Sequence, residues 1–219
     1  MDFWDVISTA RAMRRYKPDP IPEELLVKLI EAAHLGPSGS NRQSRHWIVV
    51  RDPEVKQQLA DLNRAGVSMY LEHNREAANP HVDQGRRERF LAAVEHQMNH
   101  MHEVPAIVIA CADLVRAPQD SFGAGSAAAT EVWGAVQNLL LAARALEVGS
   151  VPTTLAFIGD QRDQAREVLG LPEHILPMVL IPLGWPTGNF GPIRRRPLEE
   201  ILHWDRYEAQ TESPEGVKV

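Results

Sequence analysis

Two groups of basic residues, far apart in the chain, are the first candidates for chemistry. One comprises Arg11, Arg14, Arg15 and Lys17, and the other is the arginine run 194–196. Planar guanidinium groups match the oxygens of a phosphate, and several of them compensate its ~1.5–2 negative charges. The chain as a whole is acidic, with a formal net charge of −6. The pattern indicates a site for a small anion, and two solvated charged runs are the simpler alternative.

Two polar segments between these groups could contact a heterocyclic ligand. Residues 37–43 read PSGSNRQ and combine backbone freedom with hydroxyl and amide groups. Side-chain amides can donate and accept hydrogen bonds along the edge of a ring. Residues 152–154 add a proline and two threonines, soon after Gly149, which is expected to end a helix. Either segment taken alone is more often an ordinary turn.

A histidine pair and a single cysteine are two further candidates for reactive groups. His96 and His100 are four residues apart, so one helix face could present both to a metal ion. The metalloprotease pattern needs a general base after the first histidine, and Gln97 cannot take a proton. Both histidines point away from the apolar stripe of their segment, which favours a solvated polar face, so no metal site is expected. Cys111 lies in an apolar run and is expected to be a buried, inert thiol.

Helices and strands of mixed order must position these residues. Helical periodicity and end signals predict helices over 2–11 and 22–35, from 52 onward, in two pieces within 66–103, and over 127–146 and 160–169. Apolar runs predict strands over 47–50, 105–112 and 178–184, with a short strand or extended loop over 150–155.

Apolar stripes mark the expected buried faces of two of these helices. In the second piece of 66–103 the stripe comprises Phe90, Leu91, Val94, Met98 and Met101. In the long helix it comprises Val132, Trp133, Val136, Leu139, Leu140, Ala143 and Leu146. The long helix is apolar enough to be the central, mostly buried one.

Composition excludes several classes of protein. A chain of 219 residues that is 44% hydrophobic can bury a sizeable core, and its one cysteine cannot form an internal disulfide. The acidic balance argues against nucleic acid as a partner. The longest apolar-rich run, 132–143, is too short to span a bilayer, and no signal peptide is visible. A cytoplasmic protein with no membrane partner is expected, and neither a Rossmann glycine pattern nor a Walker loop is present.

Four spaced motifs, taken together, resemble the nitroreductase family of FMN-dependent oxidoreductases. Residues 11–22, RAMRRYKPDPIP, are similar to the family's opening R-S-x-R-x-F-x-x-x-P-x-P run. Residues 36–43, GPSGSNRQ, are similar to its A-P-S-x-x-N-x-Q loop. Residues 137–143, QNLLLAA, followed by Gly149, look like its central helix, and 194–200, RRRPLEE, look like its C-terminal signature. The resemblance spans about 3–207.

This resemblance implies a fold and a division of the chain. The fold would be α+β (mixed α/β), with a central mixed sheet flanked by helices, a long buried central helix and a C-terminal extension reaching a dimer partner. Residues 1–207 would form one FMN-binding domain. Within it, 66–103 would be a variable helical cover and 190–207 the extension. Residues 208–219 would be a flexible tail.

The resemblance also implies a cofactor and an activity. FMN would bind at two sites on the interface of a homodimer, with NADPH or NADH as reductant. Small electron-poor acceptors such as nitroaromatics or quinones would be reduced by a ping-pong mechanism with no catalytic side chain. Arg11 and Arg195 would hold the FMN phosphate, and Arg14 would lie at the N1/O2 edge of the ring. The FMN contacts implied by position are Arg11, Ala12, Met13, Arg14, Pro37, Ser38, Gly39, Ser40, Asn41, Gln43, Pro152, Thr153, Thr154, Arg194 and Arg195.

The chain departs from the family pattern at a few positions. Ala10 and Ala12 flank the first arginine where relatives often have Arg and Ser, and Ser44-Arg45 replaces a Pro-Trp pair. Two alternatives therefore stay open beside acceptor reduction. One keeps the fold but performs reductive dehalogenation, substrate dehydrogenation or flavin breakdown. The other is a non-enzymatic FMN-binding dimer.

Overall fold

A four-stranded antiparallel sheet forms the centre of the protein. The computed structural model describes residues 1–74, 84–117 and 124–207. The strands are β1 (Arg45–Val50), β2 (Ala106–Asp113), β3 (Gly149–Ser150) and β4 (Ile175–Gly184), in the order β1-β2-β4-β3. The α+β class is confirmed. The expected mixed sheet is wrong for the described residues, whose three strand pairings are all antiparallel. In the described part of the connection from β1 to β2 there are two helices, whereas a parallel pair is usually joined by a single crossover helix.

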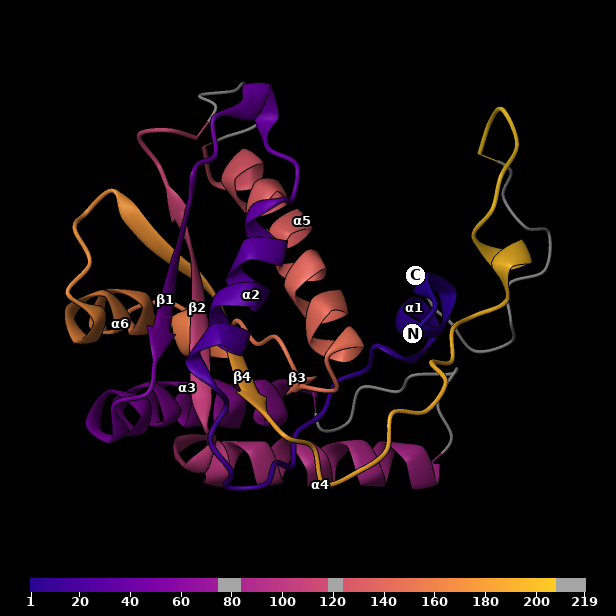
Figure 1. Cartoon of the computed structure of the whole chain (residues 1–219), viewed down its shortest axis with the longest axis horizontal. Helices are drawn as coiled ribbons and strands as arrows, with labels where there is room; N and C mark the ends of the chain where they lie inside the picture. Colours follow the sequence, from indigo (N-terminus) through magenta and orange to yellow (C-terminus); the bar gives the residue numbers. More distant parts are fainter. Residues whose placement is uncertain (75–83, 118–123, 208–219) are drawn as a thin grey trace.

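Helices cover both faces of this sheet (Figure 1). The helices are α1 (Phe3–Thr9), α2 (Glu23–His34), α3 (Pro53–Asn74), α4 (Gln84–His100), α5 (Ala124–Ala145) and α6 (Gln161–Leu169). α2 and α5 pack together on one face, and α3 and α6 contribute to the core on the other. None of the helices in the described ranges is long and apolar enough to cross a bilayer.

β2 is buried on both faces, which explains its uninterrupted apolar run. Ala106, Val108 and Ala110 belong to the core under α2 and α5. Ile107 and Cys111 belong to the core on the side of α3 and α6. Cys111 is 0% exposed, and burial raises the pKa of its thiol to about 12. The expectation of a buried, inert cysteine is confirmed.

The long helix α5 is central, as predicted, but it begins earlier and one of its stripe residues is misplaced. Val132, Val136 and Leu139 are buried against the sheet. Trp133, however, is 42% exposed. One step along a helix turns a side chain by about 100°, so Trp133 leaves the buried face that Val132 occupies.

α4 packs on α3 through only part of its expected stripe. Leu91, Val94 and Met98 contact Val67 and Leu71 of α3, and together they form a separate small core. α3 runs without a break past residue 66, so the two expected pieces of 66–103 are the end of α3 and the whole of α4. Phe90 does not follow the stripe, because it is 44% exposed and faces a cleft described below.

The segment after α1 pairs with the segment after β4. The first helix is shorter than the expected 2–11, and residues 10–17 continue as extended chain. The amide of Lys17 donates to the carbonyl of Trp185 at 2.7 Å, and the amide of Thr187 donates to that of Arg15 at 3.1 Å. A Cβ at Gly184 would lie 2.8 Å from Tyr16, so only glycine permits this close approach. The pairing brings the two basic groups of the sequence together.

Residues 194–207 leave the body of the protein beside α1 (Figure 1). They contain one short 3₁₀ turn, Leu198–Glu200, and expose large apolar side chains. Ile201 is 51% exposed, Trp204 78% and Tyr207 81%. Residues 208–219, expected to form a flexible tail, lie outside the described residues. The division into one domain with a cover and an extension stays a prediction.

Candidate functional site

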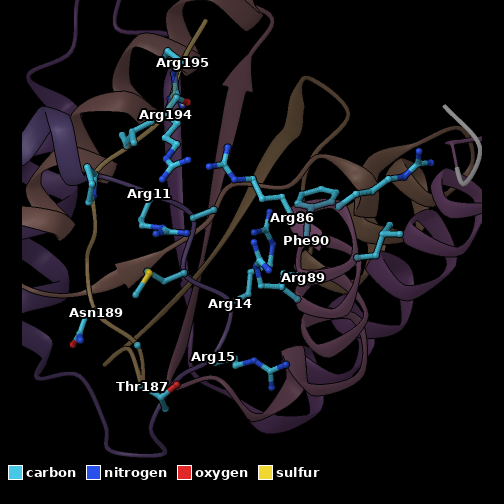
Figure 2. A pocket seen from close by; sticks show the side chains of 18 of the residues that line it. Arg11, Arg14, Arg15, Arg86, Arg89, Phe90, Thr187, Asn189, Arg194 and Arg195 are labelled. Carbon is cyan, nitrogen blue, oxygen red and sulfur yellow. The ribbon is translucent and has the colours of Figure 1, made fainter. Parts of the chain in front are cut away.

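A large cleft opens where residues 11–15, residues 187–195 and α4 meet (Figure 2). Its volume is about 1580 Å³. Tyr70 and Leu71, near the end of α3, complete the wall that α4 forms. Pockets for a single small ligand measure roughly 300–1,000 Å³. The cleft therefore has room for more than one small molecule.

Arginine dominates the lining of the cleft. The arginines are Arg11, Arg14, Arg15, Arg86, Arg87, Arg89, Arg194 and Arg195. No aspartate or glutamate is among the described residues that line it. Positive charge gathered in a concave, low-dielectric surface attracts anions strongly, even when the whole chain carries a charge of −6.

Arg14 is the most constrained of these arginines. Its side chain is half-buried, and its guanidinium carbon lies 5.4 Å from the centre of the Phe90 ring. Burial lowers the pKa of Arg14, the phenol of Tyr16 opposes that shift, and the charge of Arg11 adds to it. Its Nε is buried without a hydrogen-bond partner in the protein. A buried donor without an acceptor is costly, so the geometry fits a ligand that supplies one.

The predicted convergence of the two basic groups is present in the structure. Arg11 belongs to the segment 11–15, and Arg194 and Arg195 belong to the segment 187–195, and Figure 2 shows the three residues on the same side of the cleft. The Arg195 side chain donates to the carbonyl of Arg194 at 3.1 Å. Arg196 does not line the cleft; it faces Glu200 at 4.0 Å. Two of the last three arginines are thus placed to bind an anion together with Arg11.

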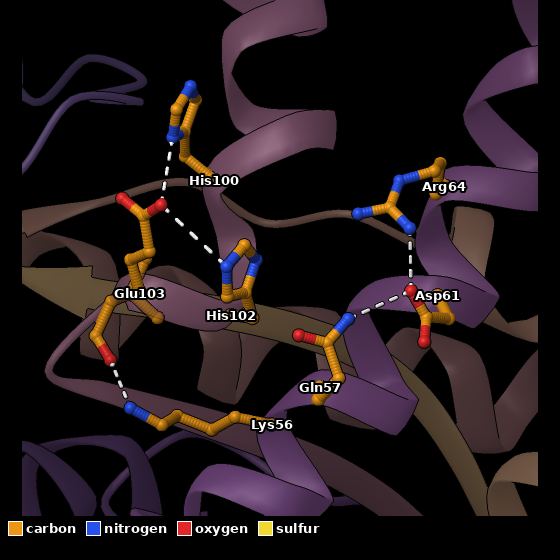
Figure 3. Close-up of polar contacts among 8 residues, drawn as sticks. Lys56, Gln57, Asp61, Arg64, His100, His102 and Glu103 are labelled. Carbon is orange, nitrogen blue, oxygen red and sulfur yellow. Dashed lines mark hydrogen bonds and ion pairs between the residues drawn. The ribbon is translucent and has the colours of Figure 1, made fainter.

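One histidine of the pair contacts an arginine that lines the cleft. Nδ1 of His96 lies 2.9 Å from the Arg15 guanidinium, and the two histidine rings stack at 4.3 Å. His100 faces Glu103 instead, at 3.1 Å (Figure 3). Burial, Arg15 and His100 lower the pKa of His96, with Glu103 opposing them, which favours a neutral ring. Among the described residues, no three His, Cys, Asp or Glu side chains are grouped to hold a metal ion.

The polar loop 37–43 does not line this cleft within one chain. Its backbone is nonetheless fixed in an unusual shape. Ser40, Asn41 and Gln43 have φ values of 50°, 52° and 52°, in the left-handed region that glycine favours. The amide of Gln43 donates to the Ser38 hydroxyl at 2.9 Å. Strained backbone of this kind concentrates at binding sites, so a ligand-contacting role for the loop stays a prediction.

A buried carboxylate holds the polar loop, and sequence reasoning missed it. Glu131 of α5 accepts a hydrogen bond from the amide of Gly39 at 2.7 Å and another from the Ser44 hydroxyl. Arg45 is also buried and donates to the carbonyl of Gly36 at 2.8 Å. Burial lowers the pKa of Arg45, and the charge of Glu131 opposes that shift. The signal was available, because Glu131 is the one acidic residue in the apolar sequence of α5.

The segment 152–154 does not line the cleft, but it follows Ser150, which contacts a lining residue. The amide of Met13, a lining residue, donates to the carbonyl of Ser150 at 3.0 Å. The Thr153 hydroxyl contacts the buried side chain of Asn63 at 3.1 Å. Thr154 is exposed. A hydrogen bond from this segment to a ring in the cleft stays a prediction.

Comparisons with known proteins agree with this architecture. The family model described as the nitroreductase family matches residues 7–185. A protein of Thermus thermophilus named NADH dehydrogenase is 34% identical over 207 residues, covering 89% of this chain and 91% of that protein. The crystal structure of nitroreductase A from Vibrio parahaemolyticus is 21% identical, with a TM-score of 0.73, and the match covers 96% of this chain and 79% of that one. The structure of NADPH:FMN oxidoreductase from Vibrio harveyi, complexed with NAD⁺, is 21% identical, with a TM-score of 0.70 over 95% and 79% of the two chains.

The family match extends from α1 to the residue after β4 and so includes the strands, α5 and the first wall of the cleft. With the arginine-lined cleft, the half-buried Arg14 and this match together, the chain belongs to the nitroreductase family.

Proposed function

We propose that this chain is an FMN-dependent oxidoreductase that takes electrons from NADPH or NADH and reduces small electron-poor acceptors, such as nitroaromatics or quinones, by a ping-pong mechanism. The observation that carries the proposal is the half-buried Arg14, whose Nε has no partner inside an arginine-lined cleft. The names of the relatives support the same chemistry, because they include an NADH dehydrogenase and two FMN reductases of Bacillus subtilis.

The lining residues fit FMN in both charge and size. Arg11, Arg194 and Arg195 would hold the phosphate, and Arg14 would lie at the N1/O2 edge of the ring, where the reduced flavin carries negative charge. FMN, when bound, supplies the two-electron redox chemistry. Arg14 then stabilises negative charge without reorganising, because its guanidinium is already packed under Phe90. No side-chain acid or base is required for that role.

A homodimer would complete the site. In support of this, the loop 37–43 carries ligand-type groups but lies outside the cleft of its own chain. Exposed Trp4 of α1 and exposed Trp204 of the C-terminal segment, at 72% and 78%, present apolar surface that a second copy would cover. We infer that each copy lends its polar loop to the cleft of the other and that residues 194–207 lie against the partner.

Sedimentation equilibrium tests the dimer. The protein at micromolar concentration is expected to sediment at twice the 24.5 kDa chain mass, because the exposed tryptophans become buried between copies. Replacing Trp204 by serine should weaken association, because it removes the most exposed tryptophan of residues 194–207. A single-chain mass for the wild-type protein at that concentration would contradict the dimer.

Anaerobic mixing with NADPH or NADH tests the activity. The purified protein is expected to be yellow. Its visible flavin absorbance should disappear after anaerobic mixing with the reductant and return when a nitroaromatic or quinone is added. Yellow protein that neither reductant bleaches would instead indicate a non-enzymatic FMN-binding dimer. Protein that bleaches but passes electrons to none of these acceptors would favour dehalogenation or dehydrogenation, to be assayed on substrate panels.

A further inference from the structure

Arg144, in the last turn of α5, connects three parts of the chain behind the cleft. Its Nε donates to the hydroxyl oxygen of Thr9, the last residue of α1, at 2.8 Å. That hydroxyl donates in turn to the carbonyl of Asp5 inside α1, which fixes its orientation. On the other side, the guanidinium carbon of Arg144 lies 4.2 Å from the centre of the Phe190 ring. The ends of α5 and α1 and the segment 187–195 therefore meet at one side chain.

The segment 187–195 leaves the cleft surface where it meets Arg144. Within this segment, Phe190 and Gly191 are the two residues that do not line the cleft. A Cβ at Gly191 would lie 3.4 Å from Nη1 of Arg11, so the backbone there passes beside the Arg11 guanidinium. The contact between Arg144 and Phe190 thus holds the segment one residue away from the point where it packs on Arg11.

The surroundings of Arg144 do not satisfy it as a purely structural residue. Its side chain is half-buried, and its Nη1 is buried with no hydrogen-bond partner among the described residues. A buried donor without an acceptor costs stability, and an apolar side chain of similar length would carry no such donor. What a guanidinium adds is direction, because it stacks on an aromatic ring and donates in its own plane at the same time.

We propose that Arg144 is a positioning residue for the phosphate of FMN. It does not line the cleft, so it acts on the ligand through its neighbours. It holds the segment 187–195 against the end of α1, so that Arg194 and Arg195 reach the same phosphate as Arg11. This inference rests on the proposed function and adds a residue that none of the four sequence motifs contains.

Paired titrations with FMN and riboflavin, which lacks only the phosphate, test the proposal in the variant R144M. The wild-type chain, freed of flavin, should prefer FMN by about 100-fold or more, because each charge-assisted hydrogen bond to the phosphate is worth roughly tenfold or more. R144M should lower this preference about tenfold, with the Kd for riboflavin changed less than about threefold. Its Tm should shift by less than about 4 °C, because methionine fills the space without a buried donor.

The matched control is R166M. Arg166 is also a half-buried arginine in the last turn of its helix, α6, and its Nε is buried without a partner among the described residues, but it does not line the cleft. R166M should keep the preference for FMN within about twofold. F190L should lower the preference as R144M does, and the double variant R144M/F190L should lose no more than the larger single effect, because one contact is removed in all three.

Three results overturn the proposal: equal affinity of the wild-type protein for the two flavins, a preference for FMN that R144M leaves unchanged, or an R144M protein that binds both flavins equally weakly. Wild-type protein that binds neither flavin would overturn the proposed function. Hydrogen exchange would then still decide whether Arg144 holds the segment, because the amide of Ile193 donates to the carbonyl of Ser8 at 2.8 Å. That amide should exchange faster in R144M than in the wild-type protein or R166M, and an unchanged rate would overturn the positioning role.

Discussion

A variant with alanine at both Arg11 and Arg195 is expected to lose its yellow colour on dialysis. The two guanidinium groups line the same cleft from two segments far apart in the sequence and are proposed to hold the FMN phosphate together. A hydrogen bond to a charged group contributes about 1.5–3 kcal/mol, so each loss should raise the Kd for FMN by roughly 10- to 150-fold. Flavin fluorescence quenching on titration of the apoprotein measures this Kd directly.

Arg196→Ala is the matched control for the Arg195 change. It is the next residue in the chain but lies outside the cleft and faces Glu200 at 4.0 Å. The Kd of this variant for FMN should stay within about threefold of the wild-type value. Arg196 does not line the cleft, so salt and water largely screen its charge from the ligand. If the single variant Arg195→Ala stays fully yellow after dialysis, the role given to Arg195 is wrong.

Replacing Glu131 by alanine is expected to cost about 3–5 kcal/mol of unfolding free energy. Glu131 is 7% exposed, and its loss leaves the Gly39 amide and the Ser44 hydroxyl without their acceptor. It also removes the negative charge that offsets the buried Arg45 guanidinium. Denaturant unfolding followed by circular dichroism measures the change. The polar loop 37–43 should become accessible to proteases in the same variant.

Two further variants test whether the buried position, rather than the charge alone, explains this cost. Glu95→Ala removes a carboxylate from the exposed side of α4 and should change stability by less than about 0.5 kcal/mol. Glu131→Gln keeps an acceptor for Gly39 but loses the charge, so its effect should fall between the two. A Glu131→Ala protein as stable as Glu95→Ala would show that the polar loop does not depend on this residue.

Local signals in the sequence predicted the parts of the fold that depend on burial alone. β2 was predictable because both its faces are covered, so its first seven residues, before Asp113, form one apolar run. Trp133 and Phe90 were wrongly expected on the buried face. Helical periodicity does not distinguish a residue at the edge of the buried face from its neighbour in the sequence, which points about 100° away. The packing of α4 on α3 leaves Phe90 exposed to the cleft. This packing is a tertiary contact, which the sequence of α4 alone does not predict.

The candidate site was predictable from charge, but only in part. The convergence of Arg11 with Arg195 could be inferred because an acidic chain had two isolated basic groups. Arg86 and Arg89 gave no such signal, since arginines on a polar helix normally belong to a solvated surface. Their role as cleft residues arises from tertiary packing. Glu131 did give a signal, as the one acidic residue of α5, but the sequence does not show that it contacts the loop 37–43.

The pairing of the segment after α1 with the segment after β4 has a consequence for synthesis of the protein. The indole of Trp185 donates to the carbonyl of Pro20, a contact across 165 positions, and Ile193 reaches back to Ser8. A ribosome must therefore release nearly the whole chain before the walls of the cleft can meet, and contacts of such long range close slowly. A ligand that binds only the closed arrangement stabilises these last contacts by mass action. With FMN as the proposed ligand, the cellular supply of FMN is expected to govern the yield of folded protein as well as its activity.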